Sequence, residues 1–320
     1  MKIGIIGAGH WGSNLIRNYA EMGYLSAVCD QDHKLLQQVS KIYSKVALYQ
    51  DPNEFLKDRH VDAVVIATPP ISHYSLAKMM LLAGKPTFVE KPLCLCVAEA
   101  EELVALAAER SLPLMVGHLL HYHPAFKALQ NLLDSGKLGQ LRYIYSHRLA
   151  LGKVRREENA LWSFAPHDIS MVLALTQNMP QSVTAHGSSF ITPNIADTTI
   201  SYLNFPYGVR AHIFVSWLHP YKDQRFVVVG SEGMAVFDDV QPPEAKLLLY
   251  SHKVDVTYGL PTVQRAEATP IPLAWSEPLR SECEAFIEFA HRGKIPPSTG
   301  AEGLRVLRVL TMLQQSLDNT

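Results

Sequence analysis

The sequence predicts an α/β protein in which a doubly wound parallel sheet is followed by an α/β domain with a large open mixed or antiparallel sheet. A glycine-rich turn directly follows the first short apolar strand, and strands alternate with helices up to about residue 120. Beyond residue 180, extended segments follow one another without intervening helices. With 320 residues the chain is long enough for two domains, which we expect at residues 1–120 and 121–320.

The first strand and the turn after it predict a dinucleotide site. Residues 2–6 are apolar and rich in β-branched side chains, as in a buried strand. Gly7, Gly9 and Gly12 form GxGxxG, in which the glycines allow the tight turn, the approach of a pyrophosphate and close helix packing. A helix over residues 13–21 would then direct its N-terminal N–H groups at the phosphates. A plain strand-to-helix turn is the alternative reading of this motif.

The rest of the first domain continues the alternation, and its second strand ends on an acidic residue. Asp30 lies 18 positions after Gly12, near the spacing of the carboxylate that binds the adenosine ribose. A carboxylate there would repel a 2′-phosphate, so NAD is favoured over NADP, unless Asp30 is only a turn residue. We expect strands at 25–29, 46–49, 61–68, 86–90 and 114–117, and helical segments at 33–44, 51–56, 72–83 and 98–110.

The second domain has a different pattern. Helices are expected at 124–135, 166–175, 279–292 and 302–317, and strands at 141–150, 182–190, 197–204, 209–217, 225–230 and 234–237. Consecutive strands favour an antiparallel or mixed sheet, whose apolar face needs cover and thus suggests self-association. Residues 241–272 contain several prolines and little periodicity, and no elements are assigned there.

Composition and charge exclude several function classes. The formal net charge of −1 gives no electrostatic basis for binding nucleic acid or a membrane surface. No signal peptide and no apolar run of membrane-spanning length is recognised, so a cytoplasmic protein is expected. The four cysteines are interpreted as ordinary thiols. His118, His121 and His123 have no spacing typical of a zinc site, so no metal is expected and His118 and His123 are assigned to the ligand cleft.

Four segments together resemble one family of oxidoreductases. These are GIIGAGHWG at 4–12, ATPPISHY at 67–74, AGKPTFVEKPL at 83–93 and APHDIS at 165–170, and the resemblance extends over the whole chain. They are similar to the Gfo/Idh/MocA family. This implies a Rossmann domain and a C-terminal domain whose open sheet serves substrate binding and oligomerisation, as a dimer or tetramer. It also implies a cis Lys91–Pro92 bond, which would direct the lysine into the cleft.

Two later segments narrow the resemblance. Residues 151–170 and 215–239 are similar to family members that oxidise C3 of a UDP-activated N-acetylhexosamine. The implied product is a 3-keto sugar for a PLP-dependent aminotransferase in the synthesis of a 2,3-diamino sugar of lipid A or surface polysaccharide. Oxidation of an alcohol by NAD requires a base and a group that holds the developing oxyanion. His167 is expected to be the base, and Lys91 to hold the oxyanion. A capping or core histidine and a solvated lysine are the alternatives.

The remaining site residues are assigned around these two. The expected cofactor-binding residues are Gly7, Gly9, His10, Trp11, Gly12, Asp30, Thr68, Pro69, Pro70, His73, Glu90, Lys91, Pro92 and His118. The expected substrate-binding residues are Lys91, Tyr122, Arg155, Arg156, Asn159, Trp162 and His167. Arginine can bind a diphosphate bidentately, although Arg155 and Arg156 also fit a solvated loop. For His73, a cofactor contact and a helix cap remain equal alternatives, and Tyr122 and Trp162 fit core packing equally well.

One position departs from the family pattern. Many members carry an aspartate four residues before the catalytic histidine, where this chain has Ser163. Another residue must then orient His167, and the candidates are Asp168, Glu157 and Glu158. Two alternative functions remain. One is an NAD-dependent dehydrogenase of a free sugar or inositol, and the other, which Ser163 favours, is an NAD-binding regulatory protein without turnover.

Overall fold

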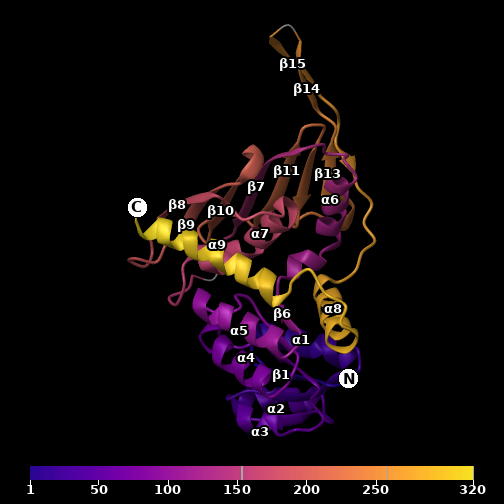
Figure 1. The fold of residues 1–320 in the computed structure, drawn as a ribbon, viewed down its shortest axis with the longest axis vertical. Helices are drawn as coiled ribbons and strands as arrows, with labels where there is room; N and C mark the ends of the chain where they lie inside the picture. The colour runs from indigo at the N-terminus through magenta and orange to yellow at the C-terminus, as the bar shows by residue number, and fades with distance from the viewer. Residues whose placement is uncertain (153, 258, 320) are drawn as a thin grey trace. The chain divides into compact units, whose positions relative to one another are not determined.

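The computed structural model describes residues 1–152, 154–257 and 259–319, which form two compact units (Figure 1). The first unit contains Met1–Leu119 and Glu277–Leu307. The second contains Leu120–Ser276 and the C-terminal stretch from Arg308 onward. Residues 277–307 fall within the range expected for the second domain, yet they are part of the first compact unit.

The first unit is built on a six-stranded parallel sheet with the strand order β3-β2-β1-β4-β5-β6. This order reverses between β1 and β4, as in a doubly wound dinucleotide-binding fold, and confirms the predicted fold class. The strands are β1 (Ile3–Ile6), β2 (Leu25–Cys29), β3 (Ala47–Tyr49), β4 (Ala63–Ile66), β5 (Thr87–Val89) and β6 (Leu114–Val116). All four residues of β1 and of β4 are buried, because helices cover both faces of the sheet.

The crossover helices follow the expected alternation. They are α1 (His10–Glu21), α2 (His33–Ile42), α3 (Pro52–Leu56), α4 (His73–Leu82) and α5 (Val97–Glu109). Helix α1 begins three residues before the predicted start, because Gly9 is its N-cap residue and the N–H of Ser13 donates to the Gly9 carbonyl at 2.9 Å. The side chains of Asp32 and Asp51 cap α2 and α3.

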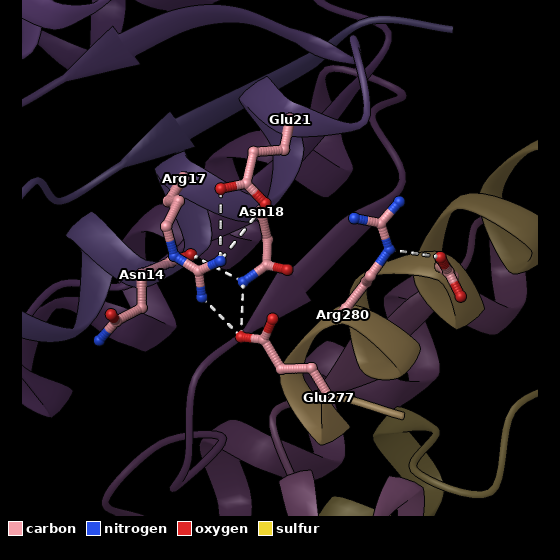
Figure 2. Close-up of polar contacts among 7 residues, drawn as sticks. Asn14, Arg17, Asn18, Glu21, Glu277 and Arg280 are labelled. Atoms are coloured by element: carbon pink, nitrogen blue, oxygen red, sulfur yellow. Dashed lines mark hydrogen bonds and ion pairs between the residues drawn. The ribbon is translucent and has the colours of Figure 1, made fainter. Parts of the chain in front are cut away.

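Helix α8 (Pro278–Arg292) belongs to the first unit through contacts with α1. Figure 2 shows Glu277, the residue before α8, accepting from Arg17 Nη2 at 2.5 Å and from Asn18 Nδ2 at 3.4 Å. On the same helix, Phe286 packs edge-on against Phe88 of β5, with ring centroids 5.7 Å apart. The late helix therefore completes the core of the N-terminal unit.

The second unit contains an eight-stranded mixed sheet with the order β16-β13-β12-β11-β7-β10-β9-β8. The neighbours β7 and β10 are parallel, and the other neighbouring pairs are antiparallel. The main strands are β7 (Leu141–Leu149), β8 (Ser182–Ser188), β9 (Thr198–Asn204), β10 (Arg210–Ser216), β11 (Asp223–Gly230) and β12 (Met234–Asp238). The predicted open mixed or antiparallel sheet is thereby confirmed.

Helices cover one face of this sheet. Helix α7 (Ala160–Thr176) packs on β7, β9 and β10, and α6 (Pro124–Asp134) packs on β12 and β13. On the other face, Tyr143, Tyr145, His212 and Phe214 are half-buried, and the rings of Tyr145 and His212 stack with centroids 5.4 Å apart. This second face is thus an aromatic surface that the described helices leave uncovered.

The stretch over 241–272, to which the sequence assigned no element, contains further strands. These are β13 (Leu247–Tyr250), β14 (Lys253–Thr257), β15 (Leu260–Gln264) and β16 (Thr269–Pro270). β13 and β16 extend the large sheet, whereas β14 and β15 form a separate hairpin that projects from it in Figure 1. Helix α9 (Gly300–Asp318) closes the chain. Within the described parts of the chain, no helix is both long enough and apolar enough to cross a membrane.

Candidate active site

The glycine-rich turn after β1 has the geometry of a phosphate cradle. Gly7 has a φ of +104°, a conformation that L side chains rarely adopt. A Cβ atom on Gly12 would lie 2.1 Å from the Gly7 carbonyl oxygen, so only glycine fits. A Cβ on Gly9 would meet nothing within 4 Å, which leaves the space beside the N-terminus of α1 open to a ligand. His10, the first residue of α1, is exposed there.

Asp30 lies at the end of β2 and binds this turn. Its Oδ2 accepts a hydrogen bond from the Ala8 N–H at 2.7 Å, and its Oδ1 accepts from the Asp32 N–H at 2.8 Å. These bonds fix the carboxylate next to the glycine-rich turn, at the carboxyl edge of the sheet where dinucleotide ribose binds in this fold. The predicted ribose-binding residue therefore also holds the turn itself.

Thr68, Pro69 and Pro70 follow β4 at the same edge, and His73 ties them to the next strand connection. The His73 ring contacts the carbonyl oxygens of Thr68 and Pro92, both at 2.8 Å. Burial lowers the pKa of His73, so the ring is neutral at pH 7 and donates to one of these carbonyls at a time. The ring thus links two loop segments. The Ser72 hydroxyl also bonds to Thr68, donating from Oγ to the side-chain Oγ1 at 2.7 Å.

Glu90, Lys91 and Pro92 come directly after β5, and the Lys91–Pro92 peptide bond is cis. The Glu90 Oε1 accepts from the indole Nε1 of Trp11, and its Oε2 accepts from the backbone N–H of Lys91 at 3.2 Å. Gly117 leaves room for this carboxyl, since a Cβ there would lie 2.7 Å from Glu90 Oε2. Trp11, which is 38% exposed, therefore joins the glycine-rich turn to the segment that carries Lys91.

Two buried carboxyl groups lie behind Lys91. Burial raises the pKa of Glu90 to about 7, although the Trp11 hydrogen bond and the charge of Lys91 act in the opposite direction. Glu282 of α8 is fully buried, and neither of its carboxyl oxygens has a hydrogen-bond partner among the described residues. Burial and the negative charge of Glu90 raise its pKa well above the usual value. Of the two, Glu90 accepts hydrogen bonds and therefore ionises at the lower pH, whereas Glu282 keeps its proton to higher pH.

His118, assigned to the cofactor, lies at the end of β6 and is almost completely buried. Its Nδ1 contacts Glu302 Oε2 at 2.5 Å, so a carboxylate 184 positions away is its partner. His123 belongs to the second unit, where its Nδ1 caps α6 by accepting from the Ala125 N–H at 3.1 Å. His123 also faces Asp239, at 3.4 Å from Nε2 to Oδ1.

In the second unit, His167 lies in the middle of α7. The predicted helix start at Pro166 is wrong: the helix begins at Ala160, and Pro166 lies inside it. The reason is Asn159, whose Oδ1 caps the helix by accepting from the Trp162 N–H at 3.1 Å. Asp168, a candidate partner for His167, forms a bidentate pair with Arg148 of β7 at 2.8 and 3.1 Å.

The segment before α7 carries the expected substrate residues. Arg155 and Arg156 are exposed, and the Arg155 guanidinium pairs with Glu158 at 3.1 Å. Glu157 accepts from the Arg156 backbone N–H at 3.2 Å. The structure thus brings the two acidic candidates to this arginine pair.

Asn159 and Trp162 meet on one residue of α9. Gln314 Oε1 accepts from Asn159 Nδ2 at 2.8 Å and from Trp162 Nε1 at 2.9 Å. Tyr122 is only 3% exposed, and the Lys127 ammonium lies over its ring. Gln314, Arg148 and Glu302 were not singled out in the sequence, because each is an isolated polar residue whose partner is distant along the chain. Glu282 was missed because its burial depends on the tertiary fold.

The chain was compared with protein families and known proteins. Residues 1–118 match the family model "Oxidoreductase family, NAD-binding Rossmann fold", and residues 126–236 match "GFO/IDH/MocA C-terminal domain". UDP-N-acetylglucosamine 3-dehydrogenase of Acidithiobacillus ferrooxidans is 29% identical over 99% of this chain and 97% of that protein. Inositol 2-dehydrogenase 2 of Saccharopolyspora erythraea is 28% identical over 95% of this chain and 89% of that protein.

Solved structures show the same relationship. A structure of the Acidithiobacillus ferrooxidans enzyme GnnA has a TM-score of 0.87 and 27% identity, covering 100% of this chain and 98% of that one. A putative oxidoreductase from Magnetospirillum magnetotacticum has a TM-score of 0.84 and 28% identity, with 98% and 99% covered. The NAD-binding family model and the glycine cradle with Asp30 agree on the cofactor, which is NAD.

Proposed function

We propose, from the premise that this chain belongs to the Gfo/Idh/MocA family of oxidoreductases, that it oxidises C3 of UDP-N-acetylglucosamine or a close UDP-N-acetylhexosamine. The product is the 3-keto sugar. The general activity, that of an NAD-dependent dehydrogenase acting on CH–OH, follows from membership of the family. The position of Lys91 is the observation that supports the chemistry, because this lysine follows β5 at the carboxyl edge of the NAD-binding sheet, next to the buried Glu90.

The proposed reaction breaks the C3–H and O–H bonds of the sugar and forms a C=O bond. Bound NAD supplies the hydride acceptor, and the glycine cradle, Asp30 and the Glu90–Trp11 pair would hold it. His167 accepts the hydroxyl proton on its imidazole, since an ordinary histidine pKa suits proton transfer near neutral pH. The Lys91 ammonium stabilises the oxygen as negative charge develops on it. The charge of Lys91 acts to lower the pKa of the neighbouring Glu90, so the two side chains interact electrostatically.

The nucleotide part of the substrate is assigned to the segment before α7. Arg155 and Arg156 are exposed and belong to the same stretch of chain as the cap of the His167 helix. A diphosphate is a bidentate acceptor for guanidinium groups. The 29% identity to a UDP-N-acetylglucosamine 3-dehydrogenase over nearly the whole chain supports this choice of substrate.

Mass spectrometry is the first experiment. The protein is incubated with NAD and UDP-N-acetylglucosamine in the presence of hydroxylamine, which traps a ketone and draws the uphill oxidation forward. We expect the oxime of a 3-keto nucleotide sugar, and none without NAD. Absence of any trapped product with this substrate and with other UDP-N-acetylhexosamines, while NAD binds, would reject the proposed substrate.

A free polyol is the second candidate substrate. Two relatives support it: the inositol 2-dehydrogenase 2 named above, and the myo-inositol 2-dehydrogenase of Thermotoga maritima, 25% identical over 99% of this chain. A polyol has no diphosphate, so the two arginines distinguish the candidates. The double variant Arg155→Ala, Arg156→Ala should raise the KM for a nucleotide sugar at least tenfold. Turnover of myo- or scyllo-inositol that is indifferent to this change would favour the polyol.

We also propose an oligomeric state for the enzyme and the class of enzyme that uses its product. The half-buried aromatic face of the eight-stranded sheet supports self-association into a homodimer or homotetramer. A 3-keto sugar is chemically suited to a PLP-dependent aminotransferase, which we propose as the next enzyme, in the cytoplasm and toward lipid A or a surface polysaccharide. Analytical ultracentrifugation tests the assembly. Conversion of the untrapped 3-keto product to an amine, by an added aminotransferase with an amino-acid donor and without hydroxylamine, tests the sequence of steps.

A further inference from the structure

A buried ion pair connects α7 to the sheet beneath it, one residue after His167. Asp168 is 1% exposed and Arg148 is 9% exposed. The Arg148 Nε donates to Asp168 Oδ2 at 2.8 Å and its Nη2 donates to Oδ1 at 3.1 Å. The fully buried Ser146, two residues earlier on β7, donates to the same Oδ1 at 2.5 Å. Both carboxylate oxygens are thereby used by residues of β7.

The helix needs this connection at this point. Pro166 lies inside α7 and has no N–H, so one hydrogen bond of the helical ladder is missing in the turn before His167. A proline within a helix also tends to kink it, which would turn the following side chains. Asp168, the residue directly after His167, is one member of the bidentate pair. The two parallel hydrogen bonds and the opposite charges together hold the helix against β7.

We propose that Asp168 is a positioning residue that acts through His167. It does not take up the substrate proton. Its bidentate pair with Arg148 holds the turn of α7 that follows Pro166, so that the imidazole keeps the orientation required for proton transfer. Ser146 completes the anchor. This inference rests on the proposed role of His167 as the base, and it assigns the task left open by Ser163 to a residue bound to the sheet.

The second unit offers a matched control. Asp223 and Arg225 of β11 form another aspartate–arginine pair, at 2.8 and 2.5 Å, in the same sheet. Asp223 is also buried, with 5% exposure, but its arginine partner is two residues away on the same strand, and its other neighbour, His147 at 3.7 Å, lies on β7 and not on α7. Asp223→Asn therefore removes a similar charge and similar hydrogen bonds without loosening α7.

The first experiment compares Asp168→Asn with Asp223→Asn. Misplacing a catalytic group by about 1 Å can cost on the order of a hundredfold in rate. We expect Asp168→Asn to lower kcat 10- to 100-fold with the Kd for NAD changed less than twofold, and Asp223→Asn to lower kcat less than twofold. The milder Ser146→Ala should lower kcat three- to tenfold, and it replaces Asp168→Asn if that variant does not fold. Equal losses in the Asp168 and Asp223 variants would overturn the proposal.

A double-mutant cycle separates positioning from general damage. In a His167→Asn background there is no base to orient, so adding Asp168→Asn should change kcat less than twofold. If the two losses multiply, Asp168 does not act through His167 and the inference is wrong.

A spectroscopic measurement keeps the inference apart from the choice of substrate. The imidazole resonances of His167 are identified by their loss in His167→Asn. They should shift in Asp168→Asn and remain in place in Asp223→Asn. If no substrate is found but the resonances shift as expected, the positioning of His167 stands while the proposed reaction fails. If product forms in the wild type and the resonances do not move in Asp168→Asn, only the positioning inference fails.

Discussion

The two compact units hold their candidate site residues in different ways. In the first unit, Gly7, Gly9 and Gly12 act through the backbone, and the chain conformation itself forms the cradle. In the second unit, two candidate residues are held by side chains from distant elements: Asp168 by Arg148 and Asn159 by Gln314. A site formed by the backbone uses residues that are close together in the sequence. A site held by side-chain pairs uses residues that are far apart in the sequence.

The units also differ in the direction in which the pKa of a buried or half-buried carboxyl group is shifted. In the first, burial raises the pKa of Glu90 to about 7, and Glu282 has no described hydrogen-bond partner. In the second, hydrogen bonds from His123 and Lys246 overcome burial and lower the pKa of Asp239 to about 2. Perturbed pKa values are concentrated at functional sites. Of the carboxyl groups compared, those whose charged form is disfavoured lie in the cofactor-binding unit.

The strongest test of the comparison removes one chemical group from each unit. Lys91→Ala and His167→Ala should each lower kcat by two to four orders of magnitude, about 3 to 5 kcal/mol in the barrier. NAD binding, measured by isothermal titration calorimetry, should survive in both variants, with Lys34→Ala as a control for an exposed lysine. Loss of NAD binding in a folded variant of either kind would show that cofactor binding and chemistry are not divided in this way.

The second test uses two neighbouring glycines. Gly9→Ala should fold normally, because its Cβ meets nothing within 4 Å, but should weaken NAD binding at least tenfold by occupying the space for the pyrophosphate. Gly12→Ala should weaken NAD binding and also lower the Tm, because its Cβ would lie 2.1 Å from the Gly7 carbonyl oxygen. Calorimetric binding and thermal unfolding distinguish the two. Equal Tm values for both variants would contradict the backbone geometry of the turn.

The third test concerns pH. Glu90 has a raised pKa in the folded protein, so the native state holds its proton up to about pH 7 while the unfolded state loses it near 4.5. Its contribution to stability therefore falls as pH rises from about 4.5 to 7, by about 3 kcal/mol. Glu90→Gln should remove this fall and stabilise the protein above pH 7, measured by urea unfolding at several pH values.

The matched variant in the other unit should have the opposite sign. The Asp239 pKa is lowered, so its contribution is present above about pH 4 and is lost as pH falls toward 2. Asp239→Asn should destabilise the protein at pH 7 by up to about 2 kcal/mol. If Glu90→Gln and Asp239→Asn change stability in the same direction at pH 8, the contrast between the units is wrong.

The smallest expected effect is at the start of α7. Asn159→Ala removes an N-cap and the bond to Gln314, and should lower the free energy of unfolding by about 1 kcal/mol. The exposed neighbour of Gln314, Gln315, serves as the control through Gln315→Ala. A loss of substrate affinity in Asn159→Ala with unchanged stability would instead assign Asn159 to the substrate.

The same contrast explains what the sequence could predict. The glycine-rich turn and the positions of the parallel strands along the chain were predictable, because GxGxxG and buried apolar runs are local signals. The start of α7 was not, because the proline at 166 suggested a helix start and the capping role of Asn159 depends on tertiary context. Arg148, Gln314 and Glu302 carry no local signal, since their partners lie 20 to 184 positions away. The strands after residue 241 were missed because their residues lack strict alternation.

The division of the first unit between two chain segments has a consequence for synthesis on the ribosome. The NAD-binding unit begins at Met1 but requires residues up to Leu307, after the whole span Leu120–Ser276 has been made. At a translation rate of about 5 to 20 residues per second, the apolar surface that α8 covers in the folded protein stays exposed for about 10 to 40 s. During this interval the nascent chain is therefore most prone to aggregate and to be bound by holdase chaperones. A fragment ending near residue 120 should bind such chaperones rather than NAD.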